Sequence, residues 1–147
     1  MQIDKLGSIL LIIGYIIFEI MNILYLIPSL NNAIFPAGSD PLIAQLAVTI
    51  LPYLLINVVL GIVGIIIGVS AIIKEPSRRI GVIGTVIAYF INIYTIFFLF
   101  VYIPIISGTG EPWLLAQYAG FIIFIFTIII STLVGFVGSM LILLAHK

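Results

Sequence analysis

The chain has 147 residues, of which 64% are hydrophobic and only 7% are charged, and its mean hydropathy is +1.46. A water-soluble domain of this length needs a far larger polar surface, so the composition excludes that class of protein. Five basic and five acidic residues give a net charge of zero, which provides no sign of nucleic-acid binding. The lack of cysteine excludes disulfides, iron–sulfur clusters and thiol chemistry.

Four long apolar stretches make up most of the chain. Each exceeds the ~20 residues that a helix needs to cross ~30 Å of hydrocarbon. Backbone groups in lipid must pair within their own segment, so we predict an all-α integral membrane protein, built as a four-transmembrane-helix bundle. Proline cannot continue a helix without losing a hydrogen bond, so Pro28 and Pro104 are predicted to end two of the helices. The predicted helices are Leu6–Ile27, Pro41–Ile73 with a kink at Pro52, Ile80–Ile103, and Pro112 to near His146.

Three short blocks occur in the same order in both halves of the chain. An acid–proline pair (Asp40-Pro41 and Glu111-Pro112) precedes Ala-Gln-x-Ala, and Gly-x-Val-Gly follows. We interpret these blocks as an internal duplication. The chain is then one membrane domain, 1–147, with a helical hairpin at 5–74, a basic turn at 75–79 and a second hairpin at 80–147. Hairpins that start on the same side are parallel repeats about an axis along the membrane normal. Such repeats occur in transporters, but a duplication can equally produce a four-helix bundle that has no role in transport.

The basic residues are confined to the two ends of the chain and to its central turn. Lys74, Arg78 and Arg79 lie in the turn, while Lys5 and Lys147 lie at the ends. Neither of the other two loops contains a basic residue. By the positive-inside rule, we expect a multi-pass protein of the cell membrane whose termini and central turn are cytoplasmic.

Small residues recur at helical spacing in the halves of the helices nearest the predicted cytoplasmic side. Such residues let helix backbones approach closely in lipid. Aromatic residues gather in the opposite halves, so we expect a bundle that is tight at the cytoplasmic side and wider outside. We interpret the aromatics as filling the wider end or facing lipid rather than as binding a quinone. The predicted packing positions are Gly61, Gly64, Gly68, Gly84, Gly135 and Gly138.

Glu19 is the one acidic residue deep inside a predicted helix. At ~1.5 Å per residue, it lies at about the same depth as polar residues of the other three helices. Desolvation disfavours a charged carboxylate, so we expect Glu19 to be neutral and hydrogen-bonded to an asparagine. Intramembrane acids are candidate proton or cation sites. The alternative, which we favour, is a polar clasp that holds the helices in register. The candidate cluster is Glu19, Asn22, Asn57, Asn92 and Ser131.

The sequence lacks the groups that most chemistry requires. The single histidine, His146, is at the C-terminus, and no metal-ligand cluster, phosphate loop or nucleophile–base pair is present. We therefore expect a protein that is not an enzyme, has no cofactor and takes no soluble small-molecule substrate. The leading hypothesis is a structural or accessory subunit of a larger membrane complex, such as a respiratory or transport complex. Its expected partners are the lipid bilayer and other membrane subunits or further copies of itself. The alternatives are a small homo-oligomeric proton- or cation-linked transporter that uses Glu19, and a quinone- or lipid-binding protein.

Overall fold

The computed structural model describes residues 3–34, 41–74, 76–107 and 112–146, with side chains omitted at 41–44, 46 and 101–119. This part of the chain is all-helical, with α1 at Ile3–Ile34, α2 at Pro41–Ile73, α3 at Arg78–Ser107 and α4 at Pro112–Ala145. All four helices are long and apolar enough to cross a membrane. The structure therefore supports a multi-pass membrane protein made of four helices.

Two helix ends differ from the sequence-based expectation. The predicted end of the first helix at Ile27 is wrong, because α1 continues through Pro28 to Ile34. Likewise, α3 continues past Pro104 to Ser107. A proline removes one backbone hydrogen bond, and a long helix tolerates that loss when the flanking bonds remain. At the next position along the helix, the Ser29 hydroxyl donates a 2.8 Å hydrogen bond to the carbonyl of Tyr25.

The central turn is shorter than predicted. Ser77 caps α3, since the Gly81 amide donates to the Ser77 carbonyl at 3.2 Å and the Ile80 amide to the Ser77 hydroxyl at 3.5 Å. Arg78 and Arg79 are thus the first residues of α3. The starts of α2 and α4 and the end of α2 agree with the prediction. Asp40, Glu75, Glu111 and Lys147 lie outside the described residues.

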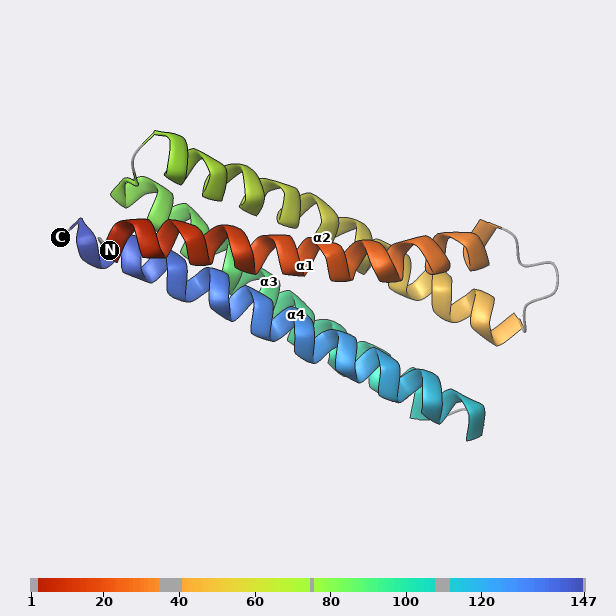
Figure 1. Ribbon diagram of the computed structural model, residues 1–147. Helices are drawn as coiled ribbons and strands as arrows, with labels where there is room; N and C mark the ends of the chain where they lie inside the picture. The colour runs from red at the N-terminus through yellow and green to blue at the C-terminus, as the bar shows by residue number, and fades with distance from the viewer. Residues whose placement is uncertain (1–2, 35–40, 75, 108–111, 147) are drawn as a thin grey trace.

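The helices form a bundle in which α1 is central. It packs extensively against both α2 and α4, whereas α3 packs mainly against α4 and much less against α2. Both termini lie at one end of the bundle together with the α2–α3 turn, and we call this the termini end (Figure 1). Towards the far end, the α1–α2 pair diverges from the α3–α4 pair (Figure 1).

Glycines make the termini end tight. A Cβ added to Gly7 would lie 2.6 Å from the carbonyl oxygen of Gly138, and one added to Gly138 would lie 2.5 Å from the amide of Leu11. At these points α1 and α4 are in backbone contact, which only a residue without a side chain permits. The expected tight end is therefore confirmed at the end that holds the termini.

The α1–α2 interface is built differently, because glycines of α2 receive side chains of α1. A Cβ at Gly61 would collide with Glu19, one at Gly64 with the ring of Tyr15, and one at Gly68 with Ile12 at 2.5 Å. Gly84 likewise faces Ser139, whereas Gly135 leaves an added Cβ 3.4 Å from the nearest atom, in the ring of Tyr15. Five of the six predicted packing glycines thus occupy crowded positions, and Gly135 has more room.

Aromatic rings fill the space between the diverging pairs. Tyr53 of α2 stacks on Phe98 of α3 with ring centroids 4.2 Å apart, and Tyr25 of α1 stacks on Phe124 of α4 at 4.0 Å. Phe121 bridges the two stacks, at 6.0 Å from Phe98 and 5.8 Å from Phe124. These contacts account for the buried aromatics of the far half as packing residues, as expected for a wider end filled by large rings.

Candidate functional site

The candidate site is the group of polar side chains buried between the helices. In the four helices of the bundle, Asn22 and Asn57 are fully buried, and Glu19 is only 8% exposed. Ser131 is 2% exposed, and Asn92 is half-buried. All five predicted site residues are therefore inside the bundle or at its edge, and their hydrogen bonds divide them into separate groups.

Asn92 belongs to a pair between α3 and α4. Its Oδ1 accepts a 3.1 Å hydrogen bond from the hydroxyl of Thr132, and its Nδ2 donates to the Ala88 carbonyl at 2.7 Å. Thr132 is fully buried and also reaches the Ile128 carbonyl at 2.9 Å. The hydroxyl of Ser131 instead donates to the Ile128 carbonyl, within its own helix.

A second polar pair joins α2 to α3. The hydroxyls of Tyr53 and Thr95 lie 3.0 Å apart, and both residues are almost completely buried. Neither Thr95 nor Thr132 is among the predicted site residues. The signal for them in the sequence was their closeness to predicted site residues, because Thr95 lies three residues after Asn92 and Thr132 directly follows Ser131.

Two tyrosines of α1 tie this helix to the second half of the chain. The Tyr15 hydroxyl donates to the Gly84 carbonyl of α3 at 3.3 Å, and the Tyr25 hydroxyl donates to the Gly120 carbonyl of α4 at 2.8 Å. Each acceptor is a glycine carbonyl, which no side chain of its own residue shields. These bonds act as the polar clasps that helix association in lipid uses.

Glu19, Asn22 and Asn57 form the remaining group, between α1 and α2. Within the described part of the chain, Glu19 Oε2, Asn22 Oδ1 and both polar atoms of the Asn57 side chain have no hydrogen-bond partner. Asn22 Nδ2 donates to the Phe18 carbonyl at 2.8 Å. The Tyr53 hydroxyl, one helical turn before Asn57, pairs with Thr95 and not with Asn57. The structure therefore does not reproduce the predicted bond between Glu19 and an asparagine.

The antiparallel register of α1 and α2 sets the relative heights of these three side chains. Glu19 contacts Gly61, and Tyr15 contacts Gly64, so facing residues have numbers that add up to 79 or 80. The same register places Asn22 level with Asn57. Both asparagines are thus about one helical turn from Glu19, towards the far end.

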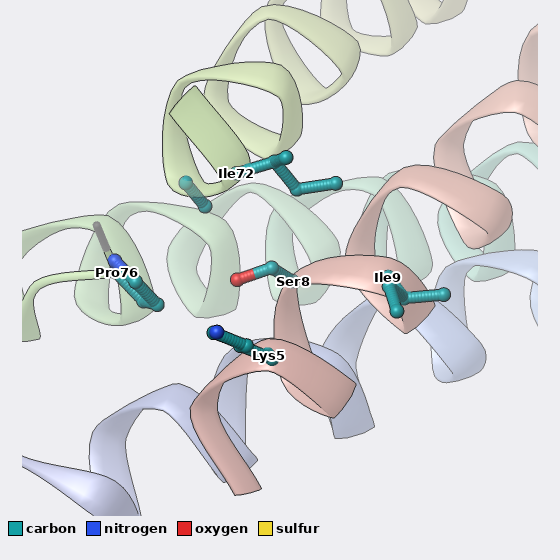
Figure 2. Close-up of a pocket in the computed structure, with 6 residues that line it drawn as sticks. Lys5, Ser8, Ile9, Ile72 and Pro76 are labelled. Carbon is teal, nitrogen blue, oxygen red and sulfur yellow. The ribbon is translucent and has the colours of Figure 1, made fainter. Parts of the chain in front are cut away.

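Besides the buried polar side chains, the structure has a groove at the termini end with both polar and apolar walls. It has a volume of about 360 Å³ and is lined by Lys5, Ser8, Ile9, Ala71, Ile72 and Pro76. Figure 2 shows the amine of Lys5 and the hydroxyl of Ser8 directed towards the same space between α1 and α2. The groove therefore has one cationic side chain beside apolar walls.

The described residues contain no group of three histidine, aspartate or glutamate side chains that could hold a metal ion. Comparison of the chain with protein-family models, curated protein sequences and solved structures found no match.

Proposed function

We propose that this chain is a structural or accessory subunit of a larger membrane complex, which it joins through its transmembrane helices. The support comes from α3, the helix with the fewest contacts inside the bundle relative to its length. The side of α3 away from the core carries large apolar side chains: Tyr89, Phe90, Phe97 and Phe100 are 64%, 53%, 64% and 75% exposed. We call these four residues the α3 face.

Tyr89 is the single observation that carries the proposal. It lies eleven residues beyond Arg78, so about 16 Å along α3 and well inside ~30 Å of hydrocarbon. Tyrosines that face lipid normally sit at the membrane surface, where water satisfies the hydroxyl. The described residues offer the Tyr89 hydroxyl no hydrogen bond, and an unpaired hydroxyl in hydrocarbon costs about 1–3 kcal/mol. A partner helix with an accessible carbonyl would remove that cost.

The corresponding tyrosine of the first half supports the same reasoning. Tyr15 follows Lys5 by ten residues and Tyr89 follows Arg79 by ten residues, so the two tyrosines are equivalent in the proposed repeat. Tyr15 is buried with its hydroxyl on the Gly84 carbonyl. We infer that Tyr89 makes an equivalent bond to a glycine or another small residue of a partner subunit, or of a second copy of the chain.

We also propose that the protein lies in the cell membrane. In the proposed orientation, both termini and the α2–α3 turn are in the cytoplasm. Lys5, Lys74, Arg78 and Arg79 lie at the termini end. Arg78 and Arg79 are in the first turn of α3, where the helix dipole disfavours cations. Anionic lipid head groups of a cytoplasmic leaflet would offset that cost.

Photo-crosslinking in native membranes tests the proposal. A photoreactive phenylalanine analogue at Phe97 should form a covalent adduct with a protein of one defined mass. The matched control is Ile130 of α4, which is 60% exposed and lies outside the α3 face. The analogue at Ile130 should react with lipid. Lipid adducts alone at both positions would refute a partner on the α3 face.

A second candidate function, a proton- or cation-linked transporter, is favoured by the unpaired polar atoms around Glu19. An acid buried in a membrane protein without a partner is a candidate transport site. Proton and cation flux through reconstituted vesicles should then fall in Glu19→Gln. Equal flux in the wild type and in this variant would count decisively against a transport role.

A further inference from the structure

The α1–α2 interface contains more unpaired acceptors than donors. Glu19 Oε2, Asn22 Oδ1 and Asn57 Oδ1 are acceptors without partners in the described part of the chain, and Asn57 Nδ2 is the one unpaired donor. Asn22 and Asn57 are fully buried, and Glu19 is 92% buried. Each unpaired buried group costs about 1–3 kcal/mol, so these oxygens favour a positively charged or hydrogen-bond-donating partner.

The register brings these side chains to neighbouring heights on the interface. Glu19 extends over Gly61, which leaves room for the carboxylate because an added Cβ would collide with Oε2. Asn57 precedes Gly61 by one helical turn, and Asn22 lies level with Asn57 on α1. The three buried side chains therefore lie within about one helical turn of one another along the α1–α2 interface.

The other polar residues of the core are not available to this group. Asn92 uses its oxygen for Thr132 and its nitrogen for the Ala88 carbonyl. Ser131 uses its hydroxyl for the Ile128 carbonyl. The site therefore belongs to α1 and α2 alone, and differs from the predicted cluster of five by excluding Asn92 and Ser131.

We propose that Glu19, Asn22 and Asn57 bind a small monovalent cation of the Na⁺ class, with the Glu19 carboxylate and the two carboxamide oxygens as ligands. Carboxylate and amide oxygens are the ligands that hard cations prefer. One carboxylate balances one positive charge, so a monovalent ion leaves the membrane interior neutral, whereas a divalent ion would leave an uncompensated charge in low dielectric. The site does not depend on the proposed subunit function, because a bound ion can be purely structural.

A proton on Glu19 is the competing explanation. Protonation turns the Glu19 carboxyl into a hydrogen-bond donor, and Asn57 Nδ2 is a second donor, so the two together are enough in number for both carboxamide oxygens. A site that holds a proton and water would respond in the same way to Na⁺ and to a large organic cation, whereas a site for a small cation would respond to Na⁺ alone. Comparing the two cations therefore distinguishes a bound proton from a bound Na⁺.

The experiment uses the full chain, purified in detergent at mildly alkaline pH, with choline replacing Na⁺ at constant ionic strength. Thermal unfolding by circular dichroism should show a Tm that rises by several degrees and saturates as Na⁺ replaces choline. The rise should be absent in Glu19→Gln and in Asn57→Leu. It should persist in Thr132→Val, which breaks the α3–α4 pair and leaves the α1–α2 site intact.

Direct binding makes the test independent of how the variants fold. Radiolabelled Na⁺ should bind the wild-type chain at one site per chain and be displaced by unlabelled Na⁺ but not by choline. A wild-type Tm that is indifferent to Na⁺, together with no saturable Na⁺ binding, would overturn the proposal and leave a proton and water as the occupants. A Na⁺ response that persists in Glu19→Gln would also overturn it.

Discussion

Replacing Gly14 by alanine tests the backbone contact between α1 and α4. An added Cβ would lie 2.5 Å from the amide of Gly135 and 2.6 Å from the carbonyl oxygen of Ser131. Ordinary contacts between such atoms are ~3.5 Å, so the helices must separate by about 1 Å. Overpacking of this kind costs about 1–3 kcal/mol, against a gain of up to about 1 kcal/mol in helix propensity. We expect a net loss of about 1–2 kcal/mol, which is a factor of about 5–30 in the ratio of folded to unfolded protein.

Gly120→Ala is the matched control. Among the side chains that the structure describes, a Cβ at Gly120 would have only the Tyr25 hydroxyl nearby, at 3.8 Å, so this substitution should be neutral or stabilising by up to about 1 kcal/mol. The assay is unfolding by increasing SDS in mixed micelles, followed by helical circular dichroism. If Gly14→Ala and Gly120→Ala unfold at the same SDS fraction, α1 and α4 do not meet at Gly14 and the described packing is refuted.

Three further predictions follow from the interfaces. Gly61→Ala should destabilise the chain by about 1–3 kcal/mol through its clash with Glu19. In a double-mutant cycle, adding Glu19→Ala should recover part of that loss, and additive losses would contradict the contact. Thr132→Val should cost about 0.6 kcal/mol in SDS unfolding, because it removes the interhelical bond to Asn92; no loss would mean that the bond contributes nothing. In this cysteine-free chain, a cysteine at Ser77 should react with an impermeant thiol reagent only from the cytoplasmic side, and labelling from outside the cell would reverse the proposed orientation.

The sequence was sufficient to predict the helices, because the length and hydropathy of a membrane span depend on local composition. It failed at Pro28, where the loss of one backbone hydrogen bond was expected to end the helix. The structure shows that this loss does not stop the helix, because α1 continues through Pro28 to Ile34.

The rotation of each helix could not be predicted from the sequence. Tyr15 and Tyr89 are equivalent only in the proposed repeat, and Tyr15 is fully buried whereas Tyr89 is 64% exposed. The difference arises because α1 lies between two helices, while α3 packs mainly against one. For the same reason, the sequence could not tell that Thr132 rather than Ser131 would bond to Asn92, since neighbouring residues point about 100° apart around a helix.

The most direct test of the central claim is native mass spectrometry of the chain, released from its own membranes by gentle solubilisation. A subunit that joins a complex through the α3 face should appear with other membrane proteins at a fixed stoichiometry, and Tyr89→Phe should lower the yield of that assembly. A homo-oligomer without other proteins would instead favour the transporter. A chain that appears as a monomer with lipid alone, under conditions that keep other membrane complexes intact, would contradict the proposed function.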